Sequence, residues 1–142
     1  MKAKDFLKQL KKLDKMIENK QIEKEQWKSI AEGTVSHSEG ERVQSSGSQQ
    51  KMADAINRYV DIEKEIDSFI DRLIDTKKDV ISVIEQLDAT DYDFLHKVYV
   101  QYFTLDDVAD IYRKSHSWAI TKHGRALQKV QRILDNRKTK SD

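Results

Sequence analysis

The sequence predicts an all-α protein, in which a long antiparallel, coiled-coil-like helical hairpin precedes a three-helix module. Proline is absent and 36% of the 142 residues are charged, a composition typical of long solvent-exposed helices. Apolar residues recur at spacings of three and four through two long segments, which is the period of a helix. Near the C-terminus, two shorter periodic runs are separated by residues that favour a turn.

The first helix is expected over residues 3–31, because its apolar side chains follow steps of four and three. These side chains are Phe6, Leu10, Leu13 and Ile17, followed by Trp27 and Ala31. The composition then changes to glycine and serine over residues 33–50, where no apolar period is present. We interpret residues 33–50 as a flexible linker that lets the chain reverse.

A second and longer helix is expected over residues 51–87, with a wide apolar face. The face comprises Met52, Ile56, Tyr59, Ile62, Ile66, Phe69, Ile70, Leu73, Ile74, Val80, Ile81, Ile84 and Leu87. One antiparallel partner helix covers only part of such a face, so we expect a second copy of the protein to cover the rest. Residues 1–87 are therefore predicted to form both the hairpin and the oligomerisation region of a dimer or higher homo-oligomer.

Three helices are predicted within residues 88–135. Thr90 is expected to cap the first of them, over residues 91–102. Thr104 is expected to cap the second, because its hydroxyl can accept a hydrogen bond from the first turn. The last residues, 136–142, are expected to form a frayed tail.

The third of these helices is amphipathic and follows a predicted turn around residues 113–117. Its apolar side is predicted to comprise Ile120, His123, Leu127, Val130 and Leu134, with Ala119, Ala126 and Ile133 beside them. Its opposite side carries Lys122, Arg125, Lys129 and Arg132. A short helix, a turn and a basic helix are the layout of a helix-turn-helix, whose second helix can enter the major groove of DNA.

The distribution of charge favours nucleic acid as a partner, although the formal net charge is only +1. Residues 88–112 contain six aspartates and one lysine, whereas residues 113–142 contain nine basic and two acidic residues. Local basic surface, rather than net charge, makes contacts with phosphate. A merely solvated helix face is the alternative for any such run of charge. The coincidence of the basic run with the predicted turn favours double-stranded DNA.

The candidate DNA contacts lie at the start and on the outer side of the third helix. The residues expected to reach base edges are His116, Ser117, Thr121 and Lys122. The residues expected to bind phosphates are Lys114, Arg125, Lys129 and Arg132. Two readings remain open for Trp118, which either packs in the core or lies against the sugar-phosphate surface. His123 falls on the apolar stripe and is expected to be a packed core histidine.

Other classes of function have little support in the sequence. The absence of cysteine excludes disulfides, thiolate metal sites and cysteine nucleophiles. The four histidines lack metal-ligand spacing, and no phosphate-binding glycine loop is present. We therefore expect no catalytic residue, metal or cofactor. No apolar run approaches the roughly 20 residues that span a bilayer, so we expect no membrane association and a cytoplasmic protein.

The C-terminal sequence resembles the region-4 helix-turn-helix of sigma factors, in the variant carried by phage and prophage proteins of Gram-positive hosts. The similarity is carried by VYVQYFTLDDVADIYRKSHSWAITKHGRALQKVQRIL, residues 98–134, and by GERVQSSGSQQKMADAI, residues 40–56. Two positions depart from the usual pattern. Arg113 stands where sigma-type turns usually place glycine, and Trp118 stands where a small or polar residue is usual.

The resemblance implies a fold with an N-terminal helical hairpin and a sigma-like C-terminal module. Members of this group are assigned by similarity as late-gene or packaging-and-lysis transcription regulators, so it also implies the bacterial host cytoplasm as location. Whether RNA polymerase is a further partner is left open by the sequence. A small terminase-like DNA-packaging protein is an alternative, which ring-shaped assemblies would favour. A second alternative is a module that contacts RNA polymerase without binding DNA by itself.

Overall fold

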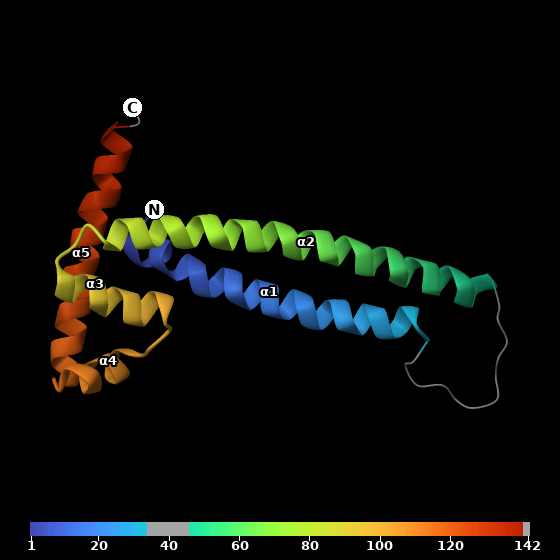
Figure 1. The fold of residues 1–142 in the computed structure, drawn as a ribbon, viewed down its shortest axis with the longest axis horizontal. Helices are drawn as coiled ribbons and strands as arrows, with labels where there is room; N and C mark the ends of the chain where they lie inside the picture. The colour runs from blue at the N-terminus through green and yellow to red at the C-terminus, as the bar shows by residue number, and fades with distance from the viewer. Residues whose placement is uncertain (34–45, 141–142) are drawn as a thin grey trace. The chain divides into compact units, whose positions relative to one another are not determined.

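A computed structural model of the protein describes residues 1–33 and 46–140. These residues form helices and include no strand, so the predicted all-α class is confirmed. The helices are α1 (Ala3–Ala31), α2 (Ser46–Ile84), α3 (Ala89–Leu95), the π-helix η1 (His96–Val100), α4 (Leu105–Tyr112) and α5 (His116–Lys140) (Figure 1).

The predicted bounds of the linker and of the C-terminal tail need correction. α2 begins at Ser46, so residues 46–50 of the predicted linker are helical, and residues 34–45 lie outside the described residues. α5 continues through Lys140, so most of the predicted frayed tail is also helix. A guanidinium nitrogen of Arg137 lies 2.7 Å from a carboxylate oxygen of Asp79 on α2, and this ion pair holds the last turns of α5.

The start and the course of the helix after α2 also differ from the prediction. Asp88, rather than Thr90, is the N-cap of α3, and its carboxylate accepts a hydrogen bond of 2.9 Å from the amide of Asp91. The predicted single helix changes at its middle into the π-helix η1. Tyr102 then adopts the left-handed conformation, with φ 65°, and ends the helical path before α4.

The chain divides into two compact units, which we describe separately. Unit 1 comprises Met1–Leu13 and Leu73–Asp142, and unit 2 comprises Asp14–Arg72. The predicted boundary between residues 87 and 88 lies inside unit 1. The reason is that the beginning of α1 and the end of α2 contribute apolar side chains to the core of the C-terminal helices.

In unit 2, ion pairs join α1 to α2. Lys20 Nζ lies 2.9 Å from Glu65 Oε2, while Arg58 binds Glu23 at 3.3 Å and Glu65 at 3.1 Å. The lower-numbered partner on α1 pairs with the higher-numbered partner on α2, so these helix segments are antiparallel. Partly exposed ion pairs contribute little individually, and apolar burial supplies most of the stability. The buried apolar residues of α2 in this unit are Ala55, Ile62 and Ile66.

The core of unit 1 is one apolar cluster to which all its helices contribute. The buried members are Ala3, Phe6, Leu7, Leu10, Val80, Val83, Ile84, Phe94, Leu95, Tyr99, Val108, Ala109, Ala119, Ala126 and Val130. A hydrogen bond of 2.7 Å from the amide of Ala3 to Gln131 Oε1 further attaches α1 to α5. A module of about 50 residues is near the lower limit for independent folding. The beginning of α1 and the end of α2 enlarge the core of this module.

Candidate nucleic-acid interface

Thr104 begins α4 with a capping box, which confirms its predicted role. Its hydroxyl accepts a hydrogen bond of 3.1 Å from the amide of Asp107, and its own amide donates to the Asp107 carboxylate at 3.1 Å. These reciprocal bonds satisfy two amide donors that a helix leaves free at its N-terminus, and a cap of this kind contributes about 1 kcal/mol. The position at which α4 starts is therefore fixed by local chemistry.

The turn between α4 and α5 is centred on Arg113, whose backbone is left-handed with φ 56° and ψ 46°. The amide of Lys114 donates to the carbonyl of Ala109 at 2.8 Å, in the pattern of a Schellman motif. The arginine thus adopts the conformation that glycine usually supplies, at a cost of about 1 kcal/mol. After the turn, Ser115 Oγ accepts a hydrogen bond of 3.1 Å from the amide of Trp118 and caps α5.

The inner face of α5 is centred on small residues. Ala119, Ala126 and Val130 are fully buried, which allows the neighbouring helices to approach closely. Ile120, in contrast, is 51% exposed, so its predicted place on the apolar stripe is wrong. Each residue turns a helix by 100°, and burial of Ala119 leaves its neighbour Ile120 turned towards solvent.

Two aromatic side chains of α5 complete this inner side. Trp118 is half-buried and packs edge-on against Phe94, with a ring-centroid distance of 5.9 Å, and beside Tyr112 at 5.4 Å. Of the two readings of Trp118, the structure supports core packing. His123 Nε2 and the hydroxyl of Tyr99 share a hydrogen bond of 2.6 Å. Burial, together with the nearby charge of Lys4, lowers the pKa of the imidazole. His123 is a packed histidine, as predicted.

Two of the predicted DNA-binding lysines are held by the acidic start of α3. Lys122 Nζ lies 2.6 Å from Asp91 Oδ1, and Lys129 binds the other oxygen of the same carboxylate. Lys129 also lies 3.4 Å from Asp88, and its bond with Asp91 raises the pKa of its ammonium group. Asp91 is only 1% exposed and Lys122 is largely covered. The expectation that Lys122 points outwards to reach base edges is therefore corrected, because its ammonium group is paired with the buried carboxylate of Asp91.

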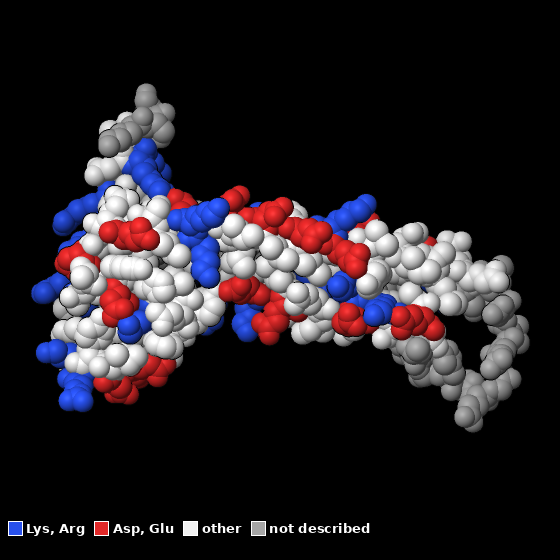
Figure 2. Space-filling view, in the orientation of Figure 1, with Lys and Arg blue, Asp and Glu red and all other residues white. Residues whose placement is uncertain are grey.

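The other predicted contacts lie on the outer surface of the module. The exposed residues among them are Lys114, His116, Ser117, Thr121, Arg125 and Arg132. Basic side chains protrude along the edge that α5 occupies (Figure 2). His116 Nδ1 also forms a hydrogen bond with the carboxylate of Asp106 on α4. The structure thus brings a polar strip, defined here as Ser117, Thr121, Arg125 and Arg132, onto one exposed side of a rigid helix.

Gly124 lies on the same exposed side of α5 as the polar strip. A Cβ atom added to it would meet nothing within 4 Å. Glycine inside a helix is less stable than alanine by about 1 kcal/mol. Packing within the described part of the protein does not require this glycine, and a backbone without a side chain lets an external partner approach closely.

The sequence pattern did not indicate the central role of Asp91. The available signal was the spacing of seven between Lys122 and Lys129, which places both on the edge of α5 nearest to its buried alanines. The pattern also did not indicate a hydrogen bond from the hydroxyl of Tyr112 to Asp93, which joins α4 to α3. Burial opposes ionisation of Asp93, but its bonds with Lys97 and Tyr112 prevail and lower the pKa of the carboxylate. These contacts hold the two short helices in place beneath α5.

The described residues contain no group of three or more histidine and acidic side chains that could hold a metal ion. Within the same ranges, none of the helices combines the length and apolarity needed to cross a bilayer. Comparisons with protein-family models, with curated proteins and with solved structures found no match to this chain. The geometry of α4 and α5 is therefore the main indication of function.

Proposed function

We propose that this protein is a DNA-binding transcription regulator, in which α4, the turn at Arg113 and α5 act as a sigma-region-4-like helix-turn-helix. The observation that carries the proposal is the exposed polar strip of α5, which is supported from behind by a fixed turn and a buried core. A helix in the major groove needs such a rigid base and an outer face of hydrogen-bonding and basic side chains. The phage or prophage origin and the late-gene role come from the sequence resemblance.

Within this proposal, the residues of the interface have different tasks. Ser117 and Thr121 are short and exposed near the start of α5, where a recognition helix meets base edges. Arg125, Arg132 and Lys114 supply positive charge for phosphates. Lys122 and Lys129 act mainly through Asp91, by holding α5 against α3. This assignment moves Lys122 from sequence recognition to support of the recognition helix.

We also propose that the antiparallel hairpin of α1 and α2 mediates self-association. Met52, Ile56 and Val60 follow one another at spacings of four on α2 and remain 41–49% exposed. A second copy that covered this stripe would remove apolar surface from water. Light scattering of the purified protein is expected to give at least a dimer mass, and Ile56→Glu is expected to shift it towards the monomer. A monomer mass for the unchanged protein at micromolar concentration would contradict self-association.

We further propose that the protein acts in the bacterial cytoplasm and that RNA polymerase is one of its partners. The direct experiment is selection of bound fragments from the DNA of the native host and its phage, using the full-length protein. We expect a recurring sequence among the recovered fragments. Recovery of fragments without any common sequence would argue against a sequence-specific regulator and favour a packaging role. Absence of bound fragments would favour a module that acts only through another protein.

A further inference from the structure

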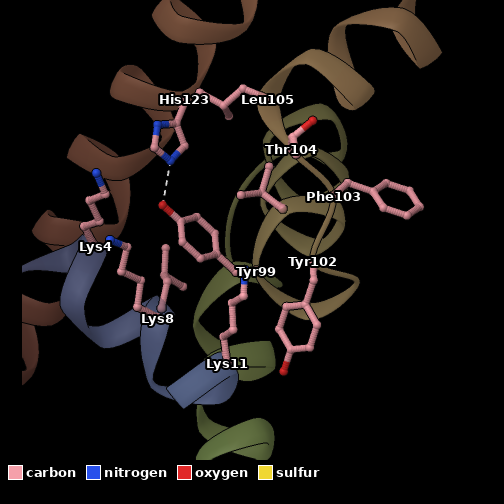
Figure 3. Close-up of a pocket in the computed structure, with 11 residues that line it drawn as sticks. Lys4, Lys8, Lys11, Tyr99, Tyr102, Phe103, Thr104, Leu105 and His123 are labelled. Atoms are coloured by element: carbon pink, nitrogen blue, oxygen red, sulfur yellow. Dashed lines mark hydrogen bonds between the residues drawn. The ribbon is translucent and has the colours of Figure 1, made fainter. Parts of the chain in front are cut away.

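A pocket of about 330 Å³ lies within unit 1 (Figure 3). None of the residues that line it belongs to the polar strip. It is bounded by α1, by the segment from η1 to the start of α4, and by His123 of α5. Its apolar walls comprise Leu7, Val98, Tyr99, Tyr102, Phe103 and Leu105. The volume falls at the lower end of the range for small-molecule sites, which begins at about 300 Å³.

One side of the pocket is formed by three lysines. Lys4, Lys8 and Lys11 are spaced by four and three residues on α1, and all three line the pocket (Figure 3). None of the described lining residues is acidic, and no ion pair within residues 1–33 and 46–140 engages any of these three lysines. Like charges at such helical spacings repel one another, and a bound anion would relieve the repulsion.

The polar groups opposite the lysines carry no negative charge at neutral pH. The hydroxyl of Tyr99 is hydrogen-bonded to His123 Nε2, and the tyrosine is 7% exposed. Burial raises the pKa of Tyr99 to about 12, and burial with the charge of Lys4 lowers the pKa of His123. Both rings are therefore neutral near pH 7 and can offer a hydrogen bond without repelling an anion.

The backbone of one wall is unusual. The π-helix η1 and the left-handed Tyr102 follow each other along the lining segment. A non-glycine residue in this conformation is strained, and π-helical turns and such strained residues are frequent at functional sites. The strain therefore coincides with the position of the pocket and of its lysines.

We propose that this pocket binds a small organic anion with an apolar body. The apolar part lies against Leu7, Val98 and Leu105, and the anionic group faces the three lysines. A metal cation does not fit, because the lysines repel positive charge. An inorganic anion alone does not fit either, because it leaves the apolar walls in contact with water. The pocket lining contains no residue of the polar strip, so this site is distinct from the surface proposed to bind DNA.

Calorimetric titration of the full-length protein tests the proposal with three probes: 2-naphthoate, the neutral 2-naphthamide and inorganic phosphate. We expect 2-naphthoate to bind at least tenfold more tightly than either of the other two. Equal affinity for 2-naphthamide would overturn the requirement for negative charge. Equal affinity for phosphate would overturn the requirement for an apolar body. Absence of binding by 2-naphthoate at millimolar concentration would overturn the site itself.

A pair of matched variants locates the bound probe. Lys8→Met keeps the length of the side chain and removes a charge that lines the pocket, so affinity for 2-naphthoate should fall at least fivefold. Lys12→Met makes the same change on α1 outside the pocket lining and should leave affinity unchanged. Thermal unfolding without ligand should be the same for both variants. An equal loss of affinity in both, or no loss in either, would overturn the assignment.

Discussion

Asp91 Oδ1 lies 2.6 Å from Lys122 Nζ, and this carboxylate is buried beneath α5. Because Lys129 binds the other oxygen, one aspartate of α3 holds two cations that are two helical turns apart. The basic side chains of α5 thus fall into two groups. One edge of the helix is bound internally to α3, while Arg125 and Arg132 remain exposed on the polar strip.

Asp91→Asn is expected to destabilise unit 1. The change removes the negative charge that the buried Asp91 side chain shares between Lys122 and Lys129. Breaking a fully buried ion pair costs about 3–5 kcal/mol, and we expect roughly 2–3 kcal/mol here because both ammonium groups reach water. Urea denaturation of the purified protein measures the change. Asp110→Asn, at an exposed position of α4, is the control and should change stability by less than about 0.5 kcal/mol. Equal effects of the two changes would contradict the role of Asp91.

Arg113→Gly is expected to stabilise the protein. Glycine adopts the left-handed conformation of this turn without the steric conflict of a side chain, and the gain should be about 1 kcal/mol. Thermal unfolding should show a higher midpoint. Lys114→Gly is the matched control, because no positive φ is found there and glycine only adds freedom to the unfolded chain. A lower midpoint for Arg113→Gly than for the unchanged protein would contradict this account of the turn.

Gly124→Ala is expected to separate stability from DNA binding. Because space around this glycine is open, alanine should stabilise α5 by about 1 kcal/mol. The added methyl group lies on the side of the polar strip, so affinity for duplex DNA should decrease even though the protein is more stable. Chemical denaturation and a binding titration on the same sample measure both quantities. Greater stability with unchanged DNA affinity would show that DNA does not approach the helix at Gly124.

Local signals in the sequence predicted the elements better than their packing. The Thr104 capping box and the extent of α1 follow from residues that are near one another in the chain. The contact of Asp91 with α5 joins residues more than 30 positions apart, and no local pattern specifies such pairing. Ile120 shows the same limit, since periodicity alone did not reveal that Ala119 would take the buried position. The pocket depends on α1 meeting η1, which the predicted division of the chain did not anticipate.

Protonation of His123 is expected to make stability depend on pH. Its pKa is lowered below 6.5 by burial and by Lys4, and the neighbouring phenol of Tyr99 remains neutral in this range. Between the folded pKa and 6.5, the unfolded state binds more protons than the folded state, so stability rises with pH. Stability should therefore fall as the pH is lowered from 7 through 6.5.

The pH series is measured by urea denaturation between pH 7 and pH 5, with and without the substitution His123→Gln. The substitution should reduce the slope of stability against pH in this range. His116→Gln, at the exposed start of α5, is the matched control for loss of a histidine. A slope unchanged by His123→Gln would assign the pH dependence to other groups.

If the exposed cations of α5 bind DNA, the affinity for DNA should depend strongly on salt concentration. For the full-length protein and duplex DNA, the logarithm of the binding constant should fall linearly with the logarithm of salt concentration. Each phosphate contact contributes about 0.9 to the slope. Arg125→Ala combined with Arg132→Ala should reduce the magnitude of the slope by roughly 2, while Lys77→Ala with Lys78→Ala on α2 should leave it unchanged. Equal slopes and affinities for all three proteins would contradict DNA binding by these cations.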